Sequence, residues 1–256
     1  MKKIGRTLGV VAAAASLAAL GSAPAHAAGD VYQGTGWRIS THHGIQSLSP
    51  DPYVIRLVKP TADDKLTPAQ NKAAEAQLRT LLKKSAAQLT SITGTKFTVS
   101  DAYHSPETAC SSAERHVIVV GLRYRPFDGK PGMSRAWPCS ASGNRSAWGG
   151  WIWMDSEYWM PDRKLEPWIL ANAVTHEVGH SIGLNHPNVD GPDADKTADP
   201  YECVTNSSKD TPVMCSPNGG YGRGKGGSVT RAKQHGGQYT PWDIEGLKAL
   251  KANFTR

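Results

Sequence analysis

The chain has 256 residues, of which 39% are hydrophobic and 20% charged, with 26 glycines and 17 prolines. This length suits one large domain or two small ones, and the composition is that of a loop-rich globular protein. It excludes a disordered chain, a collagen-like or coiled-coil fibre and a bundle of membrane helices. The formal net charge is +7, but three of the positive charges lie within the first six residues.

The first 27 residues have the three parts of a secretory signal peptide. Three basic residues precede an apolar run from residue 8 to 20, and Ala25 and Ala27 mark a cleavage site. The run is too short to cross a bilayer, and no later segment reaches 18 apolar residues. We expect a secreted, extracellular chain with no membrane span, beginning near Ala28. Without the leader, 26 basic residues face 22 acidic ones, an excess too small to indicate nucleic-acid binding.

The next segment leads from irregular sequence into a strand and a helix. Residues 28–52 are rich in Gly, Ser, His and Pro, and predict an N-terminal extension or a short pro-segment. Tyr53–Val58 has the β-branched content of a strand. Thr67 then caps a helix that begins at Pro68, carries leucines at helical spacing and ends at Gly94.

The middle of the chain predicts more strands and a second helix. Residues 97–99 and 116–120 are apolar, the latter enough to lie in a sheet covered on both faces. Residues 121–150 favour a long surface connection, with room for an edge strand. Residues 148–155 predict a further strand, and residues 165–182 a helix.

The last part of the chain is less regular. Residues 187–237 are rich in turn-forming residues and show no periodicity. A closing helix is expected from Thr240 to Asn253, because Thr-Pro-Trp-Asp supplies a cap and a first-turn proline. Together these elements predict an α/β (α+β) fold.

The four cysteines form an even set without CxxC spacing. In an exported chain, disulfides are the expected state. Three pairings exist, and we favour the sequence-local pairs, Cys110 with Cys139 and Cys203 with Cys215. The alternative, a free thiolate at Cys215 acting as metal ligand or nucleophile, fits poorly with an oxidising compartment.

The strongest chemical signal is the sequence His-Glu-Val-Gly-His-Ser-Ile-Gly-Leu-Asn-His-Pro from residue 176 to 187. His176 and His180 are four residues apart on the predicted helix, so both imidazoles leave one face and can share a metal ion. Glu177 is offset by one residue, which keeps it from ligating but leaves it near a metal-activated water. Gly183 permits a sharp helix end, after which His186 returns as a third ligand.

HExxHxxGxxH followed by a methionine turn is the signature of the metzincin zinc endopeptidases, and this sequence resembles that clan. Met214 lies in Pro-Val-Met-Cys, 28 residues beyond His186. The order of predicted elements matches too, and the resemblance is closest to the matrixin-like and serralysin-like secreted bacterial enzymes. It implies one catalytic domain over residues 53–256 with a short mixed twisted sheet, a backing helix and an active-site helix. The expected subdomains are about 53–183 and about 184–256, the smaller ending in a helix.

Carried over residue by residue, the resemblance implies that His176, His180 and His186 hold one catalytic zinc ion. Glu177 is then the general base toward a zinc-activated water. Met214 has a structural role beneath the site, which differs little from that of an ordinary core methionine. The implied partners are a polypeptide substrate and a proteinaceous inhibitor.

The sequence also departs from the family pattern. No cysteine precedes Cys110, so the cysteine-switch latency of matrixins cannot operate from the N-terminal segment. The residues after Met214 lack both the Pro-x-Tyr of matrixins and the adjacent tyrosine of astacins and serralysins. Tyr221 is interpreted as a surface tyrosine. His186 stands where the snapalysins carry Asp.

Weaker signals receive ordinary interpretations. Four aspartates after the third ligand offer oxygen ligands for Ca²⁺, but their spacing fits no defined calcium loop, and a solvated turn is favoured; they are Asp190, Asp193, Asp195 and Asp199. Asp30 is a weak candidate for an aspartate switch. The remaining histidines lack ligand spacing and are interpreted as structural or surface residues; they include His42, His43, His104, His116 and His235. Trp148, Trp151 and Trp153 stand at strand spacing, for which core packing is favoured over a substrate face.

Two functions of different classes follow from these observations. The first is a secreted zinc endopeptidase that cuts extended polypeptides laid antiparallel along an edge strand within residues 134–150. The second is a secreted binding module that keeps zinc for stability, against which Glu177 argues, because a structural site has no use for it. A gluzincin-type peptidase would need a downstream Glu ligand in place of His186. The sequence does not determine the oligomeric state or the cleavage preference.

Overall fold

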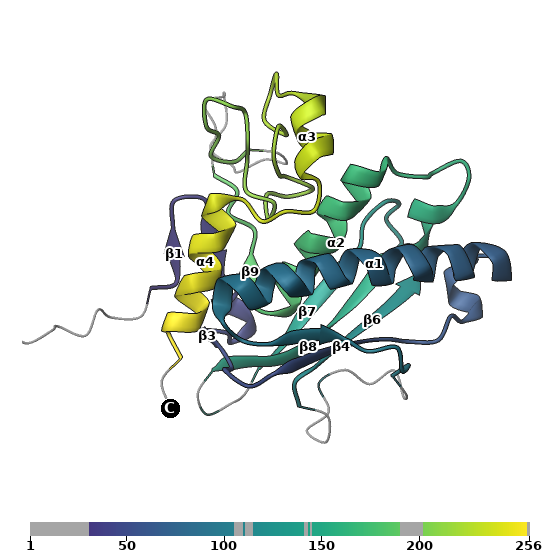
Figure 1. The fold of residues 1–256 in the computed structure, drawn as a ribbon, viewed down its shortest axis with the longest axis horizontal. Helices are drawn as coiled ribbons and strands as arrows, with labels where there is room; N and C mark the ends of the chain where they lie inside the picture. Colours follow the sequence, from purple (N-terminus) through teal and green to yellow (C-terminus); the bar gives the residue numbers. More distant parts are fainter. Residues whose placement is uncertain are drawn as a thin grey trace, which may run out of the picture.

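The structure is a computed structural model, and it describes residues 31–104, 110, 115–140, 143, 145–189 and 202–254. Helices and strands of mixed orientation form an α/β fold, as the sequence predicts (Figure 1). No helix within the described ranges is long and apolar enough to cross a membrane.

The main sheet has six strands, and its order is β3-β8-β6-β4-β5, with β7 added on β8. Most neighbours run parallel, whereas β7 runs antiparallel to β8. The strands are β3 (Ser47–Leu48), β4 (Tyr53–Leu57), β5 (Phe97–Val99), β6 (Val117–Arg123), β7 (Arg135–Ser140) and β8 (Ser146–Asp155). The predicted strands are confirmed, and the connection from 121 to 150 does carry an antiparallel strand.

Helix α1 (Pro68–Thr93) forms as its sequence predicts. Thr67 and Gln70 make a reciprocal capping box at its start, and Gly94 ends it in the left-handed conformation with φ of 70°. Leucines at helical spacing are buried against the sheet, so a long amphipathic helix covers one face. In Figure 1, α1 and α2 (Pro167–Ser181) lie side by side over that face.

The two faces of the sheet are covered differently. Ile152 and Met154 of β8 point toward the helices and are fully buried. Trp151 and Trp153 alternate with them and are half-buried on the opposite face. A Cβ at Gly121 would lie 2.1 Å from the Trp153 ring, so glycine is needed for that indole to lie across β6. The tryptophans therefore cover the outer face themselves.

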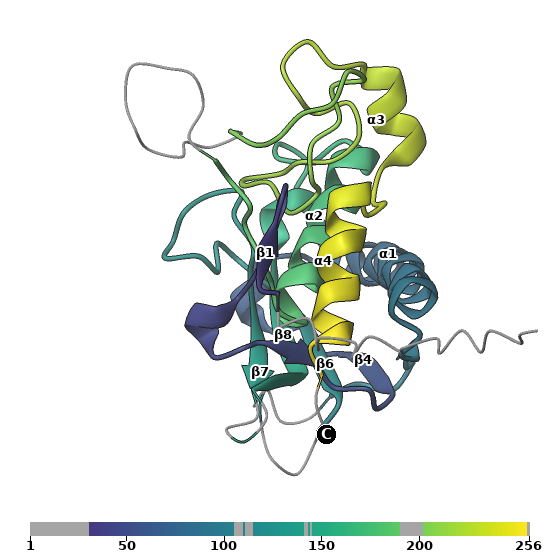
Figure 2. The same ribbon diagram turned by 90° about the vertical axis from the view of Figure 1, so that its left-hand side faces the viewer.

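The segment before Tyr53, expected as an extension or pro-segment, is part of the fold where it is described. It supplies β1 (Gln33–Gly34), β2 (Trp37–Ile39), a turn of 3-10 helix, η1 (Thr41–His43), and β3. β2 pairs antiparallel with β9 (Leu184–Asn185), which follows α2. Figure 2 shows β1 beside α4 (Pro241–Ala252). The packed fold thus begins well before residue 53.

Two further helices belong to the C-terminal part. α3 (Val229–His235) lies within the stretch that sequence patterning gives as turns only, because its single buried side chain, Ala232, leaves no periodic signal. α4 (Pro241–Ala252) begins with the predicted cap, in which Thr240 and Asp243 form a capping box. Short 3-10 turns, η2 (Ala62–Asp64) and η4 (Ser156–Trp159), complete the described elements.

Two disulfides join Cys110 to Cys139 and Cys203 to Cys215, so the sequence-local pairing is confirmed. Cys139 lies in β7, and Cys215 directly follows Met214. Free cysteines are absent, because all four are paired. These bonds are compatible with an extracellular protein.

Candidate metal centre

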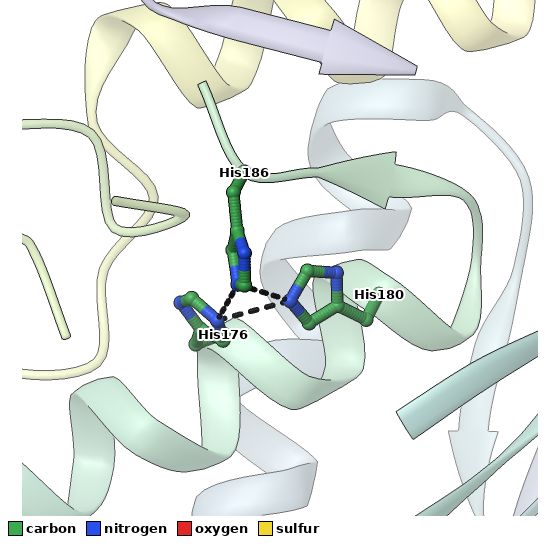
Figure 3. Close-up of side chains that lie close together, drawn as sticks. All are labelled: His176, His180 and His186. Carbon is green, nitrogen blue, oxygen red and sulfur yellow. Dashed lines mark hydrogen bonds between the residues drawn. The ribbon is translucent and has the colours of Figure 1, made fainter. Parts of the chain in front are cut away.

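Three histidines converge at the C-terminal end of α2 (Pro167–Ser181). His176 and His180 leave the same face of the helix, and His186 returns from the end of β9 (Figure 3). The Nε2 atoms of the three rings lie 2.9 to 3.0 Å apart. All three nitrogens therefore point to one place, which is the arrangement of a metal site.

Hydrogen bonds on the far side of two rings fix which nitrogen faces the centre. His176 Nδ1 donates to the carbonyl of Val213 at 2.8 Å, and His180 Nδ1 donates to the carbonyl of Leu184 at 2.9 Å. A carbonyl can only accept, so each Nδ1 carries the proton and each Nε2 offers a lone pair. This donor set fits a metal ion that prefers imidazole.

Burial keeps the three rings neutral. It lowers the pKa of His176 to about 4 and, together with the charges of His176 and His42, the pKa of His186 to about 3. The pKa of His180 is lowered well below its ordinary value, first by burial. At neutral pH the rings are therefore available as ligands, because a protonated imidazole cannot bind a metal.

The turn after α2 brings the third histidine back. Gly183 has φ of 110°, which glycine adopts readily, and its N–H donates to the carbonyl of His180. A Cβ at this position would lie 2.6 Å from Cγ2 of Ile45. The chain can then enter β9, and His186 follows directly. The turn thus brings His186 beside His176 and His180 as the third residue of the cluster.

Glu177 lies in the wall of the cavity beside the histidines, and its side chain is buried. Burial raises the pKa of its carboxyl to about 8. A cation on the neighbouring histidines would lower this pKa, because it favours the charged carboxylate. The position therefore suits a group that gains and loses a proton near neutral pH.

Met214 lies under α2, at the turn that holds His176. A Cβ at Gly179 would be 2.4 Å from the Met214 sulfur, so the helix and the turn are in direct contact. The turn is held in place by Asp243 at the start of α4, which accepts from the N–H groups of Val213 and Met214 at 2.8 and 3.2 Å. Since Val213 orients His176, Asp243 positions the metal centre from a distance.

The histidines open onto a cavity of 960 Å³. One side is formed by β7, and the other by the segment from Ser216 to Asn218. The floor follows α2 back toward its start through Ala173, Ile169 and the preceding Leu165. A cleft of this size can take several residues of an extended peptide.

Three residues of this cavity were missed by sequence reasoning. Tyr158 lies in η4, and its pKa is raised mainly by burial. The charge of the nearby Glu177 raises the pKa of Tyr158 further. His43 and Trp137 contact one another, with the indole N–H of Trp137 donating to His43 Nδ1 at 2.8 Å. The sequence separates these residues widely from the HExxH motif, and no local pattern connects them.

Other predicted candidates lie elsewhere. Tyr221 packs against the ring of His235 and does not line the cavity, in agreement with a tyrosine outside the site. His116 lies 3.4 Å from a carboxylate oxygen of Asp51, away from the metal centre. The proposed calcium ligands lie outside the described residues, as does the aspartate-switch candidate; they are Asp190, Asp193, Asp195, Asp199 and Asp30.

Comparison with known proteins adds little to this picture. No protein-family model matches the chain, and no curated protein matches it by sequence. Among solved structures it is similar to one described as "Structure of a chaperone-substrate complex", with 16% identity and a TM-score of 0.30. That match covers 87% of this chain, which spans only 36% of the other chain. A similarity of this size carries no argument about the site.

Proposed function

We propose that the protein is a secreted zinc endopeptidase of metzincin type, which hydrolyses peptide bonds of extracellular proteins. The observation that carries this proposal is the convergence of three Nε2 atoms beside a buried carboxyl, within one open cavity. A site that held a metal for stability alone would have no need of Glu177 or of a cleft.

The three imidazoles suit zinc, which often takes three protein ligands and leaves one position open for catalysis. A zinc ion bound there would activate a water molecule and polarise the scissile carbonyl. Glu177 would accept the proton of the attacking water and return it to the leaving amine, which requires a carboxyl of near-neutral pKa.

The substrate is an extended polypeptide that pairs with β7. This strand pairs antiparallel with β8 on one side, and no other strand in the described part of the chain pairs with it. Ala136 and Pro138 of this strand line the cavity, and Pro138 can offer a paired peptide only its carbonyl, because proline has no N–H. A peptide laid antiparallel to β7 would bring its backbone across the three histidines.

Cleavage of denatured casein by the purified mature chain tests this proposal, with zinc content measured by mass spectrometry. We expect one zinc ion per chain and cleavage that a zinc chelator abolishes. Glu177→Gln should keep its zinc but lose about 10³-fold in turnover, because the general base is gone. His186→Ala should lose the zinc itself, since one of three ligands is missing.

The outcomes separate the alternatives. Zinc without cleavage, in the full mature chain and in one trimmed before Val31, would support the binding module instead. Absence of zinc would overturn the metal centre as proposed. A Glu177→Gln variant with near wild-type turnover would remove the assigned base while leaving the metal site intact.

A further inference from the structure

His43 occupies the cavity from a part of the chain far removed from the HExxH motif. It ends the 3-10 turn η1, which is tied to the end of α2 by two hydrogen bonds. Ser40 N donates to the carbonyl of Gly183 at 2.8 Å, and its hydroxyl donates to the carbonyl of Leu184 at 3.0 Å. The carbonyl of Leu184 also accepts from His180 Nδ1, so one carbonyl group holds both η1 and His180.

The proton on the His43 ring has a fixed position. The indole of Trp137 can only donate, and its Nε1 lies 2.8 Å from His43 Nδ1. Nδ1 must therefore carry the lone pair, and Nε2 carries the hydrogen. The two rings meet edge to face, with centroids 5.0 Å apart, which holds the imidazole plane. His43 is thus a neutral, oriented N–H donor in the cavity wall.

Such a donor would assist the hydrolysis of an amide. Attack on the scissile carbonyl places negative charge on its oxygen, and a preoriented hydrogen-bond donor stabilises that charge in the transition state. The tyrosine that follows the methionine turn in some metzincins is absent here. Tyr221 packs against His235 instead and lies outside the cavity lining.

Two other polar groups that line the cavity are committed or distant. The hydroxyl of Tyr158 donates to the carbonyl of Gly132 at 2.9 Å. Arg223 stacks over Trp168, at the opposite end of α2 from the histidines. Nine residues of helix separate Trp168 from Glu177, or about 13 Å. His43, by contrast, lines the same cavity as His176, His180 and His186.

We propose that His43 is a catalytic residue, whose Nε2–H donates to the oxygen of the scissile carbonyl as it becomes an oxyanion. The proposal rests on the proposed peptidase function. In this proposal β7 has two roles. Its backbone would hold the peptide, and its Trp137 side chain orients His43. Substrate seated on β7 is then presented to a donor that β7 itself orients.

Kinetics of purified variants on a peptide substrate test the role. His43→Ala should lower kcat about 100-fold with KM changed less than twofold, since the interaction forms only in the transition state. His43→Gln should recover part of the loss, because its amide can donate from a similar distance. Trp137→Phe should lower kcat less than His43→Ala. Thr41→Ala, on the same turn but exposed, serves as the matched control with unchanged kinetics.

Two measurements do not depend on turnover. Nitrogen-15 NMR of labelled histidine should show His43 as the Nε2–H tautomer, and Trp137→Phe should alter that signal. Calorimetry with a phosphinic peptide, which carries a charged tetrahedral oxygen, should show weaker binding to His43→Ala, in proportion to the loss in kcat/KM. Zinc content should equal that of the wild type.

Several results would overturn the proposal. A rise in KM with unchanged kcat would make His43 a ground-state contact for the peptide. Loss of zinc in His43→Ala would make it a metal ligand, and an Nδ1–H tautomer would remove the donor. If the wild type cleaves and His43→Ala cleaves equally well, the inference fails while the peptidase stands. If the wild type neither binds zinc nor cleaves, both fail.

Discussion

The two sides of the cavity are built by different kinds of bonding. We call Arg135–Ser140 the β7 wall and residues 213–223 the turn wall. The β7 wall is held by a main-chain ladder to β8 that runs from Arg135 opposite Trp153 to Ser140 opposite Ala147. The turn wall contains no helix or strand and is held mainly by side chains.

Four polar side chains make hydrogen bonds that hold the backbone of the turn wall. Asp243 holds its start, and Asn188 accepts from Ser216 N at 2.9 Å. Asn172 donates to the carbonyl of Gly219 at 2.8 Å, and Asp210 accepts from Gly222 N at 2.9 Å. The β7 wall is stabilised by many backbone hydrogen bonds, which no single side-chain substitution removes. Each of these hydrogen bonds in the turn wall is lost when one side chain is replaced. Single substitutions should therefore break the turn wall and spare the β7 wall.

Asp243→Ala should have the largest effect. Three backbone N–H groups and one hydroxyl would lose their buried acceptor, costing about 4 kcal/mol of the free energy of unfolding. Zinc affinity should fall too, because Val213 would no longer hold His176 in place. Urea unfolding and a zinc titration measure both, with Asp243→Asn as the milder variant. A loss under 1 kcal/mol would contradict the unequal bonding of the two walls.

The disulfides give the next test, because one lies in each wall. Replacing either pair with serine should cost about 3 kcal/mol, since the closed loops span 29 and 12 residues. Only loss of Cys203–Cys215 should also lower zinc affinity, because Cys215 adjoins Met214. Thermal unfolding of the two double variants measures the loss of stability, and zinc titration measures the change in zinc affinity. Equal losses of zinc affinity would show that the β7 wall also depends on its covalent link.

Asp210 makes the turn wall sensitive to acid. Burial alone would raise the pKa of this carboxyl, but hydrogen bonds from Arg231, Asn206 and Gly222 N outweigh it and lower the pKa to about 2. A depressed pKa in the folded state adds stability above about pH 4, and this stability is lost as the pH falls toward 2.

Asp210→Asn should accordingly cost about 2 kcal/mol at pH 7 and flatten the stability profile between pH 4 and 2. Urea unfolding across that range measures the effect. Asp128→Asn is the control, because Asp128 is 69% exposed and its contact with Arg135 is 3.9 Å long. A profile for Asp210→Asn that falls as steeply as the wild type would assign the acid sensitivity elsewhere.

Arg135→Gln should have the smallest effect. Its guanidinium lies 4.0 Å from the centre of the Trp137 ring, and such a contact at a half-exposed site contributes about 0.5–1 kcal/mol. The ladder of β7 should remain, so zinc affinity should not change. A loss as large as that of Asp243→Ala would show that side chains, not the ladder, hold the β7 wall.

The sequence predicts the regular parts of this molecule well, because their signals are local. The cap at Thr67, the stop at Gly94 and the spacing of His176, His180 and His186 each lie within one or two turns of helix. These patterns give α1, the strands β4, β5, β6 and β8, and the histidine cluster directly.

What the sequence does not show depends on contacts between distant residues. His43 matters because Trp137 reaches it, and Asp243 because its cap also accepts from the methionine turn. The strands of the N-terminal segment are only two or three residues long, and two of them pair with distant parts of the chain, β2 with β9 and β3 with β8. Neither periodicity nor composition carries such information.

Hydrogen bonds join the two ends of the described chain, and they limit how far the N-terminal segment can be trimmed. Asn253 donates to the carbonyls of Val31 and Gln46, both at 2.9 Å, and accepts from Val31 N. A protease that trims the protein before Val31 leaves these hydrogen bonds intact. A cut after Ile39 would release β2 from β9 and free the turn that carries His43. Mapping the amino terminus of the purified protein would therefore locate the furthest trimming that leaves these contacts in place.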